Sequence, residues 1–138
     1  MKKVHLHEMR LSPEWFAKIS NGTKLSEARM LDKKRQELKV GDVVLFNGTL
    51  SKLITAIRIY DSFEEMSKHE NLQTILPGYK SWEQGLNEVY LEIYPKEERS
   101  KWKVIVFDLL WNRNFFLMDY FNKKFHKRKK DKRIETKN

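Results

Sequence analysis

Lys24, Glu27 and Arg29 bring three charges of mixed sign into six consecutive residues. If this segment is extended, Glu27 and Arg29 point to one side and Lys24 to the other, unless a bend at residues 25 and 26 brings all three into one cleft. A protonated lysine and an arginine can bind a phosphate or carbonyl oxygen, and a glutamate can accept a hydrogen bond from a base amino group. The segment therefore predicts an anion- or nucleotide-binding cleft. The alternative is a solvated edge strand with one ion pair.

Hydrolysis in this cleft would require a neutral Lys24, because a lysine ammonium has no electron pair with which to attack. Burial or a neighbouring cation can lower the pKa of a lysine, whereas the nearby Glu27 favours the protonated form. A charged Lys24 favours binding. We therefore rank anion or nucleotide binding above hydrolysis, and hydrolysis above a purely structural charge cluster.

Further candidate ligand contacts lie outside this segment. Lys33, Lys34 and Arg35 form a basic turn that either contacts phosphates or is solvated. Tyr79, in a turn between two predicted helices, is included as a candidate RNA contact. Trp15 is expected in the core, although an aromatic ring at the mouth of a barrel could stack on a base.

Composition narrows the class of protein. A chain of 138 residues that is 40% hydrophobic and 12% aromatic suits one domain with a packed core. The absence of cysteine excludes disulfides, thiolate nucleophiles and Cys-ligated zinc. His5 and His7 lack a third ligand nearby, so no metal and no cofactor are predicted. No apolar run approaches the roughly 20 residues of a membrane span, and we expect a cytoplasmic monomer.

Positive charge is concentrated at the C-terminus. Residues 1–111 carry 18 Lys+Arg and 16 Asp+Glu, a net charge of +2, whereas residues 112–138 carry 10 and 3, a net charge of +7. We therefore expect one domain over residues 1–111 and a basic, aromatic-containing extension over residues 112–138. A helix at about residues 114–127 is predicted to pack on the domain, and a basic amphipathic segment at a membrane surface is the alternative. The candidate nonspecific phosphate contacts are Lys127, Arg128, Lys129 and Lys130.

The elements around the charged segment follow from periodicity and turn signals. Residues 4–11 alternate as an exposed strand does, and a helix that begins after Ser12 and ends at Gly22 follows. Residues 24–31 look extended. The dipeptide Asn47-Gly48 predicts a hairpin turn between two strands.

The second half of the domain combines helices with one buried strand. Ser62 and Ser81 match the capping-box spacing at the start of two helices. Residues 102–111 are apolar on both parities, as expected for a central strand. Short strands with two or three packed helices predict an α+β fold built on a small β-barrel, rather than a doubly wound parallel sheet.

The chain resembles the ASCH domain, the activating-signal-cointegrator homology branch of the PUA-like superfamily, over about residues 4–111. The resemblance rests on the motif G-x-K-x-x-E-x-R that begins at Gly22, and on the flanking segments WFAKISNG, KVGD and EIYP at residues 15–22, 39–42 and 92–95. It implies a β-barrel with helices packed outside and a cleft that the motif faces. It also implies RNA binding, or, as in some small bacterial members, amidohydrolase activity on acetylated cytidine or ribonuclease activity.

Residue by residue, the resemblance to the amidohydrolase is incomplete. Lys24 occupies the place of the enzyme's proposed nucleophile, and Arg29 matches its arginine. Where the enzyme has a threonine three residues after the lysine, this chain has Glu27. The second acidic group of the enzyme corresponds here only to Glu70, which is displaced in sequence. The constellation therefore matches the broader family better than the enzyme.

Three functions remain open from the sequence. The first is an RNA-binding module in which the cleft takes a nucleotide and the extension attracts phosphates. The second is an enzyme acting on a modified nucleoside or on RNA phosphodiesters, and the third is a regulatory module that binds a small anionic ligand. Turnover distinguishes the first from the second, and salt dependence distinguishes the first from the third.

Overall fold

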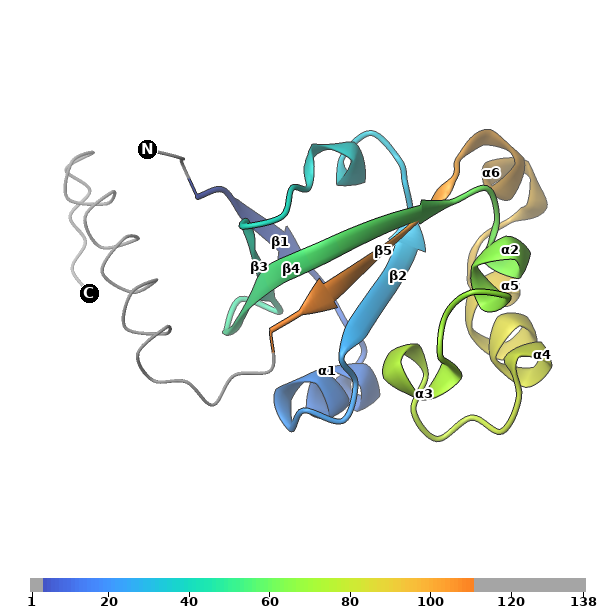
Figure 1. Ribbon diagram of the computed structural model, residues 1–138, viewed down its shortest axis with the longest axis horizontal. Coiled ribbons are helices and arrows are strands. Elements are labelled where there is room, and N and C mark those ends of the chain that lie inside the picture. Colours follow the sequence, from blue (N-terminus) through green and yellow to red (C-terminus); the bar gives the residue numbers. More distant parts are fainter. Residues whose placement is uncertain (1–3, 111–138) are drawn as a thin grey trace, which may run out of the picture.

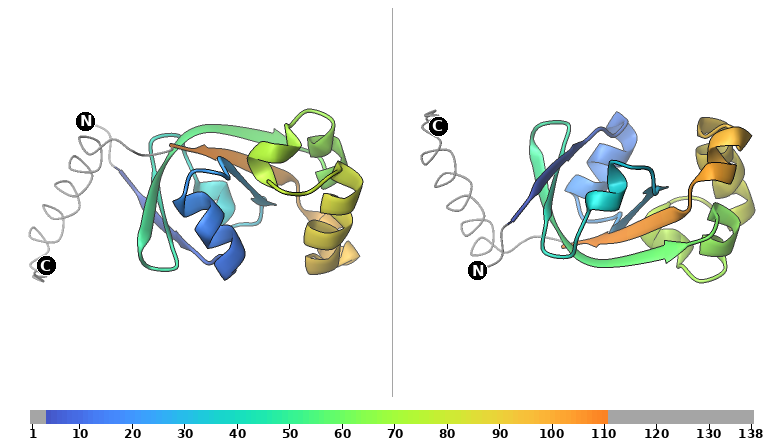
Figure 2. Two further views of the ribbon diagram at one scale, coloured as in Figure 1. Left: turned by 90° about the horizontal axis from the view of Figure 1, so that it is seen from below. Right: turned by 90° about the horizontal axis from the view of Figure 1, so that it is seen from above.

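The computed structural model describes residues 4–110 and contains one curled, five-stranded sheet that forms half a barrel (Figure 1, Figure 2). The strand order is β1-β3-β4-β5-β2. β1 and β3 are parallel, and every other neighbouring pair is antiparallel. The strands are β1 (Leu6–Met9), β2 (Ser26–Met30), β3 (Val43–Phe46), β4 (Leu50–Tyr60) and β5 (Val104–Leu109).

Helices lie in two places around this sheet. α1 (Pro13–Ser20) connects β1 to β2, and the short 3-10 turn η1 (Arg35–Glu37) precedes β3. Residues 61–103, here called the helical insertion, connect β4 to β5 and gather at one end of the sheet (Figure 1). The insertion contains α2 (Phe63–Ser67), α3 (Leu72–Ile75), α4 (Trp82–Gly85), η2 (Leu86–Tyr90), α5 (Leu91–Ile93) and α6 (Lys96–Lys101).

β4 curls the sheet because it pairs with two neighbours along its length. Its first four residues pair with β3, and residues from Ile54 to Tyr60 pair with β5. The register shifts between Ile54 and Ala56, which marks a β-bulge. A bulge increases the local twist and bends the strand that carries it.

β5 is buried on both faces because it separates two cores. Val104 and Val106 belong to a core shared with the helical insertion. Ile105 and Phe107 belong to a second core, to which α1 contributes Ile19. The apolar residues on both parities of the sequence therefore serve two different packing partners.

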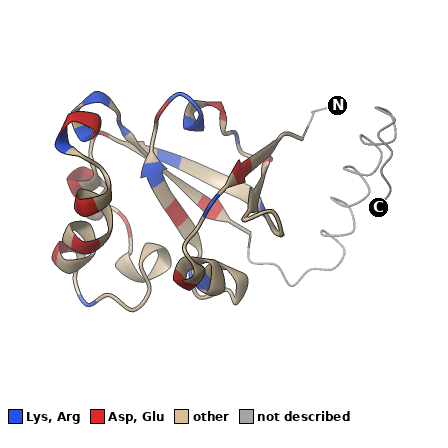
Figure 3. Ribbon diagram, turned by 180° about the vertical axis from the view of Figure 1, so that it is seen from behind, with Lys and Arg blue, Asp and Glu red and all other residues tan. Residues whose placement is uncertain are grey.

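Charge differs between the two parts of the domain. Residues 4–60 carry 10 Lys+Arg and 6 Asp+Glu, whereas the helical insertion carries 6 and 9. Acidic residues recur along the helices of the insertion, and basic residues cluster around η1 and the end of β2 (Figure 3). The anion-attracting side of the domain therefore lies near β1, β2 and η1.

The helix ends agree largely with the predictions. The hydroxyls of Ser62 and Ser81 each accept a hydrogen bond from the amide three residues later, at 3.0 Å. Ser12 precedes α1 as expected, but its hydroxyl makes no capping hydrogen bond. The helix predicted after Ser81 is helical from Trp82 to Ile93, and its middle, η2, is π-helical. Such π segments are frequent at functional sites.

The α+β, PUA-like fold class predicted from the sequence is confirmed, with a half barrel in place of a closed one. The turn at Asn47-Gly48 has positive φ at both residues, 51° and 74°, as its type requires. The basic extension, including the predicted helix at residues 114–127, lies outside the described residues. Within residues 4–110, no helix is long and apolar enough to cross a membrane.

Candidate functional site

The chain just before β2 is bent, and this bend aims Lys24. Gly22 ends α1 with φ 84°, a conformation that favours glycine. The amides of Lys24 and Leu25 donate to backbone carbonyls in α1 and α3, at 2.9 Å each. Because these hydrogen bonds hold the segment outside the strand, the side chain of Lys24 reaches Glu27 on the same side of the sheet.

Lys24 is buried, and all of its ammonium protons have acceptors. Its Nζ donates to the carbonyl oxygens of Ser26, at 2.8 Å, and Ile75, and lies 3.1 Å from Oε1 of Glu27. Burial lowers the pKa of Lys24, and Glu27 opposes that effect. Three acceptors around one nitrogen suit an ammonium, because a neutral amine offers only two protons and a lone pair. We therefore regard Lys24 as a charged group that binds the helical insertion to β2.

Glu27 lies between two cations. Its Oε2 accepts a hydrogen bond from Nε of Arg29 at 2.6 Å, and its Oε1 faces Lys24. Burial by itself would raise the pKa of Glu27, but the two cations bring it below its usual value. Glu27 is therefore an ionised carboxylate, and its burial is compensated on both sides.

Arg29 extends this array to the rim of the site. Its Nη2 donates to the backbone carbonyl of Arg10, next to β1, at 2.8 Å. Its Nη1 takes part in none of the hydrogen bonds among residues 4–110. Arg29 thus fixes the position of β1 relative to β2 and retains donors for a ligand.

Lys24, Glu27 and Arg29 line one pocket of about 270 Å³, here called the aromatic pocket. Three aromatic residues line it as well, one from α1, one from η2 and one directly after α5: Trp15, Tyr90 and Tyr94. The remaining lining residues are Arg10, Leu11, Ser12, Ala28, Leu76, Val89 and Ile93. Small-molecule sites usually have volumes of about 300 Å³ or more. The aromatic pocket is slightly smaller, so it suits one ring system rather than a large ligand.

The aromatic rings of the pocket have defined electrostatic surroundings. Nζ of Lys24 lies 5.3 Å and Nζ of Lys18 lies 5.2 Å from the centre of the Trp15 ring, within cation–π range. Burial raises the pKa of Tyr90 well above its ordinary value, and it also raises the pKa of Tyr94. Both tyrosines therefore keep their phenolic protons near neutral pH and can donate hydrogen bonds.

Within residues 4–110, the other predicted ligand contacts, which are the basic turn and Tyr79, do not line the aromatic pocket. Lys34 and Arg35 line a second pocket, together with Arg29. Lys33 is exposed and lines neither pocket. Tyr79 stacks against Trp15, with ring centres 6.1 Å apart, and does not line the aromatic pocket. Lys127 and the other predicted contacts of the extension lie outside the described residues.

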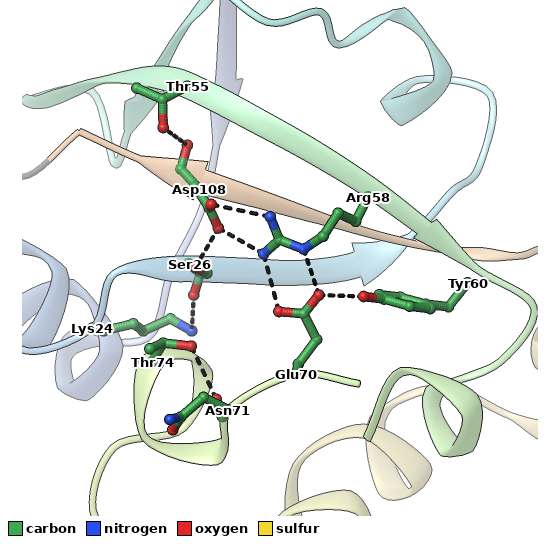
Figure 4. A network of polar contacts seen from close by, with 9 residues as sticks. All are labelled: Lys24, Ser26, Thr55, Arg58, Tyr60, Glu70, Asn71, Thr74 and Asp108. Carbon is green, nitrogen blue, oxygen red and sulfur yellow. Dashed lines mark hydrogen bonds and ion pairs between the residues drawn. The ribbon is translucent and has the colours of Figure 1, made fainter. Parts of the chain in front are cut away.

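Glu70 belongs to a polar network that reaches Lys24 only indirectly, through Ser26, Asp108 and Arg58 (Figure 4). Its carboxylate accepts hydrogen bonds from Arg58 and from the hydroxyl of Tyr60. Arg58 also donates to Asp108, which accepts from the hydroxyl of Ser26 at 2.6 Å. Glu70 lines a different pocket from Lys24, so the structure does not bring it to the aromatic pocket as a second acidic group.

The histidine pair of β1 and the segment before it serves a structural contact. His7 Nε2 lies 2.8 Å from Oδ2 of Asp42, and the amides of His5 and Lys39 also donate to this carboxylate. Among the described residues, no group of three His, Asp or Glu side chains could hold a metal ion.

Arg10, Tyr90 and Tyr94 line the site, and sequence reasoning did not single them out. Tyr90 has the spacing of the packed face of the helix predicted after Ser81, and Tyr94 directly precedes Pro95, which ends that helix. Two tyrosines spaced by four residues, the second of them within the family-like segment EIYP, are the signal that could have indicated them. Arg10 had no signal beyond its place on an exposed strand.

Comparison with known proteins gives the same class of protein as the sequence resemblance, the ASCH domain. The model of the ASCH domain matches residues 9–111. The crystal structure of hypothetical protein PH0355 has a TM-score of 0.71 and 37% identity, covering 75% of this chain and 96% of that one. The solution NMR structure of protein PF0455 from Pyrococcus furiosus has a TM-score of 0.66 and 37% identity, covering 79% and 99%. No curated protein matches the chain.

The half barrel with its outer helices and motif-lined pocket defines a PUA-like domain. Since the family model covers most of the domain, the chain belongs to the ASCH domain family.

Proposed function

We propose that this ASCH protein binds RNA or a nucleotide, with one base in the aromatic pocket. The observation that carries the proposal is the buried array of Lys24, Glu27 and Arg29 beside three aromatic rings in one pocket. Aromatic faces stack on any base, and each stacked base contributes about 1–3 kcal/mol. A carboxylate and an arginine at such a platform add hydrogen-bonding groups that discriminate among bases.

The pocket offers both acceptors and donors to a base. Each oxygen of Glu27 is bonded to one cation, and a carboxylate oxygen has a second acceptor site. The phenolic protons of Tyr90 and Tyr94 and Nη1 of Arg29 are donors. A base with both an amino group and a carbonyl group, which means cytosine or guanine, offers the complementary set.

The same contacts argue against Lys24 as a nucleophile. Its three donors are bonded to Ser26, Ile75 and Glu27, and a reaction would have to break this arrangement. A small anionic ligand alone would leave the aromatic lining without a role. Binding to a base therefore accounts for more of the pocket than hydrolysis or anion binding does.

Two exposed isoleucines provide a matched test. Ile93 is 64% exposed at the rim of the aromatic pocket, whereas Ile59 is 52% exposed on β4 and lies outside it. We expect Ile93→Glu to weaken binding of a labelled single-stranded RNA octamer about 10-fold by repelling its phosphates, and Ile59→Glu to leave it unchanged. Fluorescence anisotropy measures the affinity, and circular dichroism checks the fold.

Equal affinities of the two variants would contradict the proposal. Incubating the same wild-type sample with acetylcytidine and with the RNA, with and without divalent metal, tests the enzymatic alternative. Product formation would favour hydrolysis, and binding of a mononucleotide without any binding of RNA would favour the regulatory alternative.

A further inference from the structure

We propose that a second pocket, adjoining the aromatic pocket, binds phosphodiester oxygens, so that the ligand is a nucleotide chain rather than a free nucleoside. This inference rests on the proposed function. The second pocket, here called the basic pocket, has a volume of about 550 Å³. Its charged lining residues are Arg10, Arg29, Lys34 and Arg35, with Glu8 as the single acid.

The two pockets share a wall. Arg10 and Arg29 line both of them, and Nη2 of Arg29 donates to the backbone carbonyl of Arg10 at 2.8 Å. This contact forms the boundary between the pockets. A nucleotide whose base enters the aromatic pocket therefore has its sugar at this boundary and a neighbouring phosphate over the basic pocket.

The basic pocket contains donors without partners. Nε of Arg35 is buried and has no hydrogen-bond partner among residues 4–110, although Nη1 is bonded to Asp32 at 3.2 Å. A buried donor without an acceptor is destabilising, and a phosphate oxygen would satisfy it only after the Arg35 side chain turned toward the pocket, because this Nε is closed to solvent. Arg10 and Lys34 are exposed and form no ion pair within the described part of the chain. Two cations of the pocket are therefore uncompensated.

Short, ordered turns hold these cations in position. Asn47, in the β3–β4 hairpin, accepts from the amide and donates to the carbonyl of Leu11, at 2.8 and 3.1 Å. This pair of hydrogen bonds fixes the chain next to Arg10. On the other side, the carboxylate of Asp32 accepts from the amide of Arg35 at 3.0 Å and orders the start of η1. A phosphate site on such a frame is organised before the ligand arrives.

The distribution of charge indicates over which elements a bound nucleotide strand leaves the aromatic pocket. Residues 4–60, which supply the basic pocket, carry 10 Lys+Arg and 6 Asp+Glu, whereas the helical insertion carries 6 and 9. Acidic residues recur on the helices of the insertion (Figure 3). The acidic insertion repels phosphates, so the bound nucleotide strand leaves the aromatic pocket over β1 and η1.

A charge-matched pair of double variants tests the inference. Arg10→Gln/Lys34→Gln removes two cations of the basic pocket, and Lys33→Gln/Lys39→Gln removes two exposed cations that line neither pocket. Affinity for cytidine and guanosine, and for single-stranded RNA and DNA octamers, is measured between 50 and 300 mM salt. We expect the first variant to weaken octamer binding about 10-fold and to reduce the logarithmic salt slope by about 1.4, at roughly 0.7 per phosphate contact.

We expect the control variant to keep the wild-type slope. We expect the single variant Lys34→Gln, at a residue that lines the basic pocket and not the aromatic pocket, to bind the nucleosides as wild type does. Equal slopes for the two variants would overturn the phosphate site, while the effect of Ile93→Glu would still support the aromatic pocket. Loss of slope with the RNA and the DNA octamer alike supports recognition of the shared phosphodiester, and loss with RNA alone assigns the site to RNA. Nucleoside binding that falls with Lys34→Gln would mean that the two pockets are one site, and would also overturn the inference.

Discussion

Lys24 contributes more to the stability of the fold than its place in a sequence motif indicates. Its ammonium joins Glu27 to the carbonyl of Ile75 in α3, so it connects β2 to the helical insertion. We expect Lys24→Met to lower the free energy of unfolding by about 3–5 kcal/mol, because it leaves two buried carbonyls and one oxygen of the buried Glu27 carboxylate without the lysine donor, while Arg29 still bonds the other oxygen. Urea unfolding at neutral pH measures this loss.

Lys18 is the matched control for Lys24. Its Nζ lies at a similar distance from the Trp15 ring and donates to the carbonyl of Pro77, but its side chain is 29% exposed. We expect Lys18→Met to cost about 1 kcal/mol or less. If Lys24→Met were as stable as Lys18→Met, the Lys24 ammonium would not hold the helical insertion to β2. Lys24 would then be available for a ligand or for chemistry.

At the scale of the elements, the side-chain hydrogen bonds of Arg58 form a second connection between the helical insertion and the sheet. Arg58 in β4 bonds Glu70, which precedes α3, and Asp108 in β5 (Figure 4). The hydrogen bonds from Arg58 lower the pKa of Asp108. Among residues 4–110, Arg58→Met leaves Glu70, whose side chain is 6% exposed, with the Tyr60 hydroxyl as its one side-chain donor. We expect a loss of about 1–3 kcal/mol and faster hydrogen exchange at the amides of α3.

Lys68, which directly follows α2, provides the comparison for this experiment. It lies 3.5 Å from Glu65, and both side chains are exposed, so Lys68→Met should change stability by less than about 0.5 kcal/mol. If the Arg58 and Lys68 variants showed equal stability and equal exchange at α3, the network would not hold the insertion to the sheet.

For the full chain, the basic extension and the pockets are predicted to have separate roles. Residues 123–138 carry 9 Lys+Arg and 2 Asp+Glu, most of the net charge of the protein. We expect their deletion to weaken RNA binding by a similar factor for every sequence and to flatten the salt dependence, because phosphate contacts are independent of sequence. Affinities of several octamers at several salt concentrations check this. A loss of sequence preference with an unchanged salt slope would reverse the assignment of roles.

Local signals were sufficient for much of the fold. The hairpin at Asn47-Gly48, the caps at Ser62 and Ser81, and the end of α1 at Gly22 each depend on the conformation of a few consecutive residues. The apolar character of β5 on both parities indicated a central strand, because each parity faces a core. These features are determined by residues close together in the sequence, so a single sequence displays them.

The composition of the candidate site was decided by tertiary structure. The motif indicated Lys24, Glu27 and Arg29, but the pocket also requires Arg10, which follows β1, and Tyr90 from η2 of the insertion. Tertiary structure also decided the place of Glu70, because Arg58 on β4 holds it at a different pocket. Which side chains share a pocket depends on how the sheet curls and where the insertion packs. These are contacts between distant residues, and no local pattern of the sequence encodes them.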